Sequence, residues 1–160
     1  MIRISIVCVG RIKEKYWTEA IEEYSKRLSR YCKLEIVEVQ DEKTPDDASE
    51  AMSDQIKKKE AERILKKLDD NGFVCTLEIK GKKLTSEAFS GFLGDSALKG
   101  ISHIQFVIGG SLGLHASVLE KSDMGISFSD MTFPHQMMRV ILLEQIYRGY
   151  RIMNNEPYHK

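Results

Sequence analysis

The chain has 160 residues, with 24 lysines and arginines balanced by 24 aspartates and glutamates, so its formal net charge is zero. A chain of this length predicts one domain, because a single hydrophobic core serves chains of up to roughly 250 residues. The zero net charge excludes a protein that binds nucleic acids non-specifically through a large basic surplus, although local basic patches are compatible with it.

The sequence shows no sign of export, of a membrane segment or of a metal site. The apolar run at the start is short and lacks a cleavage site, and no stretch reaches the roughly 18 apolar residues of a membrane span. Cys8, Cys32 and Cys75 are widely separated, and an odd number of cysteines is typical of a reducing cytoplasm. Without a C-x-x-C motif or histidines at ligand spacing, we expect a cytoplasmic protein that binds neither a membrane nor a metal ion.

Strand-like and helix-like segments alternate along the chain. Short apolar or alternating segments rich in β-branched residues predict strands, at residues 2–9, 33–39, 73–79, 103–109 and 124–129. Between them, segments with apolar residues at helical spacing predict helices, at residues 13–32, 48–68, from 85 onward, 116–122 and 134–153. The alternation predicts an α/β fold, with a mostly parallel sheet and helices on both of its faces.

The segment 134–153 differs from the other predicted helices because apolar residues surround most of its circumference. Pro134 is expected at the first helical position, which proline favours. A helix that is apolar on several sides is buried on several sides, and in a small domain one of these sides is expected to face another subunit. We therefore expect a two-fold homodimer, the commonest symmetric assembly. The alternative is a central helix that its own chain covers completely.

Three segments follow predicted strands in the second half of the chain, at the edge where open parallel sheets bind ligands. They read EIKGKKLTS, IGGSLGLH and SFSDMTFPHQ. The second differs from the dinucleotide-binding fingerprint, because its glycines are spaced G-G-x-x-G and no acidic residue follows about 20 positions later. The third has two interpretations. Either Phe128 and Phe133 enclose a flat heterocycle, or Thr132 or Asp130 caps the following helix and Phe133 packs against it.

Polar groups that could perform chemistry lie on the last predicted helix and in the tail NNEPYHK, residues 154–160. Glu144 and Arg148 are four residues apart, a spacing typical of an ordinary surface ion pair. An arginine beside tyrosines, as in YRGYR, is equally suited to contact a phosphate or a base. His135 lies in the first helical turn, where the helix dipole disfavours its protonation, and His159 has no evident structural role.

The segments VCVGRIKEKYW, TLEIKGK and FVIGGSLGLH, followed by FSDMTFPHQMMRVILLEQIYRGYRI and the terminal PYHK, resemble one family over nearly the full length of the chain. This family comprises the small bacterial SPOUT-class methyltransferases of large-subunit ribosomal RNA, known as the RlmH or YbeA family. The resemblance implies an α/β sheet whose C-terminal part forms a trefoil knot. It also implies a homodimer that methylates N3 of a pseudouridine in 23S ribosomal RNA on the assembled ribosome.

The resemblance further implies that S-adenosylmethionine is the methyl donor and that loops of the knot bind it. Carried over by motif, the residues that would contact this cofactor are Leu77, Gly109, Gly110, Phe128, Ser129, Asp130, Met131, Thr132 and Phe133. Methyl transfer from a sulfonium needs no metal, but the proton on N3 of the pseudouridine must leave. We expect His159 to accept this proton, Tyr158 to stack on or hydrogen-bond the base, and Arg148 to neutralise the resulting anion or a phosphate.

Two other functions agree less well with the sequence. A ribosomal factor that binds the cofactor without catalysis would have no use for the terminal tyrosine and histidine. A SPOUT methyltransferase of transfer RNA usually carries an additional RNA-binding segment, for which this chain has no spare length. We expect the tail to fold over the cofactor pocket or to lie near the dimer interface, and to be ordered only with substrate. The lack of a basic surplus predicts slow methylation of protein-free RNA.

Overall fold

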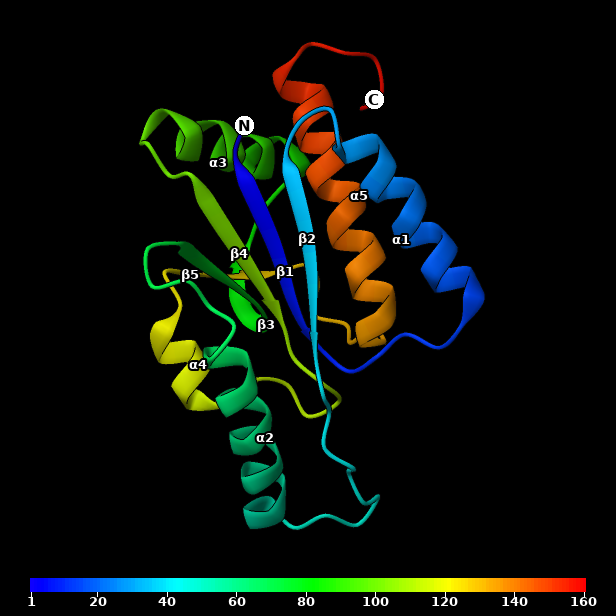
Figure 1. Cartoon of the computed structure of the whole chain (residues 1–160), viewed down its shortest axis with the longest axis vertical. Coiled ribbons are helices and arrows are strands. Elements are labelled where there is room, and N and C mark those ends of the chain that lie inside the picture. Colours follow the sequence, from blue (N-terminus) through cyan, green and yellow to red (C-terminus); the bar gives the residue numbers. More distant parts are fainter.

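The structure is a computed structural model that describes all residues from 1 to 160 (Figure 1). Its strands are β1 (Arg3–Val9), β2 (Lys33–Val39), β3 (Phe73–Lys83), β4 (His103–Ile108) and β5 (Met124–Ser127). Its helices are α1 (Lys15–Leu28), α2 (Glu50–Leu65), α3 (Ser86–Leu98), α4 (Ala116–Lys121) and α5 (His135–Met153). Every predicted strand and helix is present, although α1 and α2 are shorter at both ends than predicted. None of the helices combines the length and the apolar composition that a membrane span requires.

The strands form one five-stranded sheet in the order β2-β1-β4-β3-β5, and every neighbouring pair is parallel. The carboxyl ends of all strands therefore meet at one edge of the sheet, where the loops that follow β3, β4 and β5 lie. The predicted α/β fold with a parallel sheet is confirmed. The trefoil knot that the resemblance implies stays a prediction.

Strand β1 lies between β2 and β4, and its alternate residues face opposite sides of the sheet and contribute to two cores. On one side, Ile4, Ile6 and Cys8 pack with side chains of α1, α3 and α5. On the other side, Val7 and Val9 pack with side chains of α2 and α4. Figure 1 shows α1 and α5 side by side on one face, and α2 and α4 next to each other on the opposite face. Helices on both faces of the sheet were predicted, and this prediction is confirmed.

The end of β3 differs from the prediction in a way that shapes the ligand-binding edge. The strand ends later than predicted, because Leu77 and Lys82 both pair with Ile126 and the residues between them bulge out of the ladder. Gly81 permits this bulge, since a Cβ at that position would lie 2.6 Å from the backbone carbonyl carbon of Ile126. The bulge takes residues 78–80 out of the ladder with β5.

Helix α5 is only partly covered by the rest of the chain. Leu142, Leu143 and Ile146 are fully buried, whereas Ile141 is partly exposed. No residue of α5 is fully exposed, so both cover by its own chain alone and cover by a second subunit stay predictions. Pro134 has a ψ angle of 136°, so it precedes the helix and does not occupy the first helical position as predicted.

Candidate active site

A cavity of about 700 Å³ opens at the carboxyl ends of β3, β4 and β5, and we call it the large cavity. The three loops that the sequence singled out form its walls, and its volume is within the roughly 300–1,000 Å³ of small-molecule sites. The expected cofactor-binding residues that line it are Leu77, Gly109, Gly110, Phe128, Ser129, Met131, Thr132 and Phe133. Asp130 does not line it, because its exposed carboxylate accepts a hydrogen bond from Lys83 Nζ at 2.6 Å. The structure therefore brings together all of these residues except one.

The loop after β4 presents backbone groups to the large cavity because its glycines permit a tight reversal. Gly110 and Gly113 pair across the loop, and Gly113 has a φ angle of 85°, which favours glycine. A Cβ on Gly109 would lie 2.8 Å from the carbonyl carbon of Gly113, which is closer than real Cβ atoms approach a backbone. At Gly109, Gly110 and Gly113 a ligand therefore meets backbone, whereas Leu112 and Leu114 of the same loop add apolar side chains to the wall.

The loop after β5 is not organised as a helix cap. Ser127 Oγ donates to the backbone oxygen of Ser129 at 3.1 Å, and the N–H of Met131 donates to Ser129 Oγ at 3.0 Å. No side chain caps the first turn of α5, so the alternative in which Thr132 or Asp130 caps it is wrong. Both phenylalanines of the loop line the large cavity, as the interpretation with an enclosed heterocycle requires.

The first turns of α5 add two residues to this region. His135 lines the large cavity, and its pKa is lowered by burial first and by the positive charge of Arg139 second. Protonation is disfavoured as predicted, although burial and not the helix dipole is the main cause. Arg139 is 1% exposed, and it donates to Glu38 at 2.6 Å and to the backbone oxygen of Gly10 at 2.7 Å. Sequence reasoning missed Arg139, although a single charge in the apolar run MMRVILL indicates a buried and paired side chain.

The tail NNEPYHK is docked against its own chain. Tyr31 Oη donates to Glu156 at 2.8 Å, and Arg151 pairs with the same carboxylate and donates to the backbone oxygen of Pro157 at 2.8 Å. These residues therefore have partners within their own chain, and order only with substrate stays a prediction. No tail residue lines the large cavity, so the tail does not fold over it. A position near a dimer interface stays a prediction.

Glu144 binds most of the polar residues that were expected to act on a substrate. Its Oε1 accepts from Arg148 Nη2 at 2.6 Å, from Arg148 Nε at 3.0 Å and from Tyr158 Oη at 3.0 Å. Its Oε2 accepts from Gln145 Nε2 at 2.8 Å. The bond to Glu144 raises the pKa of Arg148, while burial and the bond to Glu144 raise the pKa of Tyr158 to about 12. At neutral pH Tyr158 is therefore a hydrogen-bond donor and not a base.

His159 is held between an arginine and a carboxylate. Its Nδ1 lies 3.1 Å from Arg148 Nη1, and because a guanidinium can only donate, Nδ1 is the acceptor. Its Nε2, 2.7 Å from Glu87 Oε1, then carries the proton and donates to that carboxylate. In this arrangement neither ring nitrogen is free to accept another proton. We refer to Glu87, Glu144, Arg148, Tyr158 and His159 as the tail cluster.

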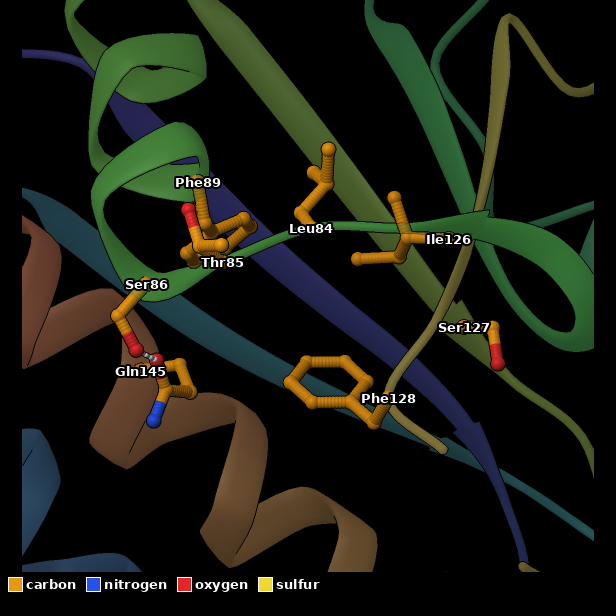
Figure 2. Close-up of a pocket in the computed structure, with 8 residues that line it drawn as sticks. All are labelled: Leu84, Thr85, Ser86, Phe89, Ile126, Ser127, Phe128 and Gln145. Atoms are coloured by element: carbon orange, nitrogen blue, oxygen red, sulfur yellow. Dashed lines mark hydrogen bonds between the residues drawn. The ribbon is translucent and has the colours of Figure 1, made fainter. Parts of the chain in front are cut away.

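A second cavity of about 190 Å³, the small cavity, lies next to the large cavity, and Figure 2 shows the residues that line it. It shares Ile126, Ser127 and Phe128 with the large cavity. Figure 2 shows Gln145 of α5 across from the Phe128 ring, with a hydrogen bond to Ser86 at the start of α3. In the chain, Gln145 directly follows Glu144 and Ser86 directly precedes Glu87, and both glutamates belong to the tail cluster. No member of the tail cluster lines either cavity.

The possible metal ligands and the cysteines form no further reactive group. No group of three or more histidine, cysteine, aspartate or glutamate side chains could hold a metal ion. Cys8, Cys32 and Cys75 are buried and unpaired, and burial raises the pKa of each thiol to about 12. These thiols are therefore small apolar core groups and not nucleophiles.

Comparison with known proteins agrees with this arrangement. A family model described as "Predicted SPOUT methyltransferase" matches residues 2–159. The "Ribosomal RNA large subunit methyltransferase H" of Clostridium tetani is 62% identical over 99% of this chain and 100% of the relative, and that of Bifidobacterium adolescentis is 59% identical over the same shares. A solved structure of a probable methylase family protein from Haemophilus influenzae shares the fold, with a TM-score of 0.52 and 13% identity over 99% of this chain and 70% of that chain. The chain therefore belongs to the SPOUT methyltransferases and, within them, to the RlmH family.

Proposed function

We propose that this protein transfers a methyl group from S-adenosylmethionine to N3 of a pseudouridine in 23S ribosomal RNA. The observation that carries the proposal is the large cavity, where all but one of the expected cofactor-binding residues meet. The printed names of the relatives supply the substrate class, large-subunit ribosomal RNA. The resemblance of the motifs supplies the pseudouridine. The protein acts in the cytoplasm, on the assembled ribosome and as a homodimer.

The size and the lining of the large cavity support binding of S-adenosylmethionine. Apolar side chains such as Leu77 and Phe133 suit the adenine ring, and the backbone of the loop after β4 offers hydrogen bonds to the polar groups. His135 also lines the cavity, and its lowered pKa keeps it neutral, so it does not repel a positively charged sulfonium. When bound, this cofactor supplies an electrophilic methyl group.

Removal of the proton from N3 is the step that residues of this chain must perform. Nδ1 of His159 becomes free to accept it only when Arg148 turns away, because Arg148 Nη1 donates to that nitrogen at 3.1 Å. Glu87 then holds the Nε2–H and stabilises the imidazolium that forms, as a carboxylate does in other histidine–carboxylate pairs. Arg148, drawn to the substrate, neutralises the anion that develops on the base. Tyr158, with a pKa of about 12, stays protonated and donates a hydrogen bond or stacks.

Two features support the homodimer and the ribosomal setting. Apolar residues of α5 such as Ile141 stay partly exposed in a single chain, and a two-fold contact would cover them. The net charge of zero gives little non-specific attraction to phosphates, so a surface made of RNA and ribosomal protein is the better partner.

The first experiment measures methyl transfer from labelled S-adenosylmethionine to assembled ribosomes that lack this methyl group. The chains compared are the full-length protein, a chain that ends after Pro157, and a matched control that ends after His159 and lacks only Lys160. We expect equal rates from the full-length and control chains. The shorter chain is expected to lose roughly 100-fold or more of the rate, the contribution of a general base, with unchanged cofactor affinity.

Each result has a distinct meaning. Equal transfer by all three chains would remove Tyr158 and His159 from the mechanism. Cofactor binding without transfer by any chain would favour a ribosomal binding factor, and transfer to transfer RNA would favour the other enzyme class. His159→Ala separates the base from the docking of the tail, and a rate within a few-fold of wild type would make that assignment wrong. Equally fast methylation of protein-free RNA would refute the ribosomal setting.

A further inference from the structure

Gln145 presents a hydrogen-bond donor and an acceptor whose positions are fixed. Its Oε1 accepts from Ser86 Oγ at 2.8 Å (Figure 2), and its Nε2 donates to Glu144 Oε2 at 2.8 Å. An ionised carboxylate can only accept, so the amide nitrogen must face Glu144 and the amide cannot be turned round. A primary amide has two donor hydrogens and two acceptor lone pairs, so one of each stays free on this side chain.

The small cavity that Gln145 lines suits a flat single ring. Its apolar walls come from Leu84, Phe89, Ile126 and Phe128. An aromatic side chain is a favourable stacking partner for any nucleic-acid base. The volume of about 190 Å³ corresponds to roughly six water molecules at about 30 Å³ each, which is enough for a one-ring base. A ring in this cavity would meet apolar surface and, at one side, the fixed amide of Gln145.

The position of the small cavity matters for the reaction. Ile126, Ser127 and Phe128 line both cavities, so a base in the small cavity lies directly beside the large one. Ser86 and Gln145, on its other side, adjoin the carboxylates that hold His159 and Tyr158. A base bound here is therefore placed between the expected methyl donor and the expected proton acceptor.

We propose that the small cavity binds the target base and that Gln145 selects pseudouridine over uridine. This inference rests on the proposed function. In uridine the sugar is attached to N1, whereas in pseudouridine it is attached to C5, so N1–H is free beside the C2 carbonyl. The free acceptor of Gln145 takes N1–H and the free donor binds O2, the two-bond pairing that an amide side chain makes with a base edge. N3 and its proton stay outside this pairing and are available for methyl transfer.

The test compares three bases at the target position of reconstituted large ribosomal subunits: pseudouridine, uridine and N1-methylpseudouridine. The third base keeps the bond between C5 and the sugar but lacks the N1 hydrogen, so it isolates the proposed contact. We expect wild-type protein to show a kcat/KM for pseudouridine that is roughly 10- to 100-fold above that for either other base, the discrimination of a two-bond pairing.

Gln145→Met removes the donor and the acceptor and nearly preserves the length of the side chain. This variant is expected to act on the three bases with kcat/KM values that differ by no more than a few-fold, and to bind S-adenosylmethionine as wild type does. The matched control is Gln55→Met, because Gln55 is exposed on α2 and lines neither cavity. The control is expected to keep the full preference for pseudouridine.

Equal methylation of all three bases by wild type, or an unchanged preference in Gln145→Met, would overturn the role of Gln145. Absence of transfer to every base by wild type would refute the proposed function instead. If Gln145→Met does not fold, as judged by circular dichroism, the wild-type comparison of pseudouridine with N1-methylpseudouridine decides the question alone.

Discussion

Arg139 offers the sharpest test of how the fold supports the site. Its guanidinium donates to Glu38 at 2.6 Å and to the backbone oxygens of Gly10 at 2.7 Å and Val9 at 3.3 Å. Arg139→Met keeps an unbranched side chain but leaves two carbonyls at the end of β1 without this donor. Glu38 is 38% exposed, so water replaces part of the lost ion pair.

The expected loss of stability follows from these contacts. A buried acceptor left without a donor costs about 1–3 kcal/mol, and two carbonyls are affected. The loss is partly offset, because the buried Nε of Arg139 has no hydrogen-bond partner and its desolvation cost disappears with the side chain. We expect a net loss of about 2–4 kcal/mol in the free energy of unfolding. For a chain of this size, the midpoint of thermal unfolding should fall by roughly 4–16 °C.

Arg63 supplies the matched control, because it also pairs with an acid, Glu42, but is 34% exposed. Arg63→Met should cost no more than about 1 kcal/mol, the usual worth of an exposed pair. Both variants are compared with wild type by urea and thermal unfolding at equal protein concentration. A loss for Arg139→Met no larger than that for Arg63→Met would refute the reasoning, because burial would then make no difference to the ion pair.

Two further predictions concern the large cavity. Gly109→Ala brings a Cβ within 2.8 Å of the backbone of Gly113 and is expected to abolish binding of S-adenosylmethionine in calorimetry, whereas Gly91→Ala, with nothing within 4 Å, should keep it. The pKa of His135 is lowered from 6.5 in the folded protein, so as the pH falls the imidazole is protonated in the unfolded chain first. The stability that neutral His135 contributes is therefore complete above pH 6.5 and is lost as the pH falls toward the lowered pKa. His135→Gln should flatten this part of the curve of unfolding free energy against pH. Binding retained by Gly109→Ala, or an unchanged curve, would contradict the respective argument.

Local patterns were sufficient to predict the elements and the edge of the sheet at which the site lies. The apolar run of β1 predicted a strand, and the alternation of strands with helices predicted parallel pairing. A parallel sheet gathers the carboxyl ends of its strands at one edge, so three loops could be named before any tertiary contact was known. Nearly all of the residues carried over by motif then line one cavity, because their loops leave neighbouring strands.

Contacts between distant polar residues could not be predicted in this way. Arg139 meets Gly10 across 129 positions of the chain, and His159 meets Glu87 across 72. No periodic pattern encodes such pairs, since they depend on how whole elements pack. The docking of the tail depends on the same kind of contact, because Arg151 binds Glu156 and the backbone oxygen of Pro157.

The two oxygens of Glu144 serve different parts of the proposed site. Oε2 accepts only from Gln145, whereas Oε1 accepts from Arg148 and Tyr158. If Arg148 turned toward a substrate and freed His159, as proposed, Oε1 would lose its charged partner but keep Tyr158, and the bond from Oε2 to Gln145 would be untouched. The amide of Gln145 would therefore keep its orientation while the proposed proton acceptor is released. One carboxylate can thus hold the element that recognises the base and allow the arginine to move, because each task uses its own oxygen.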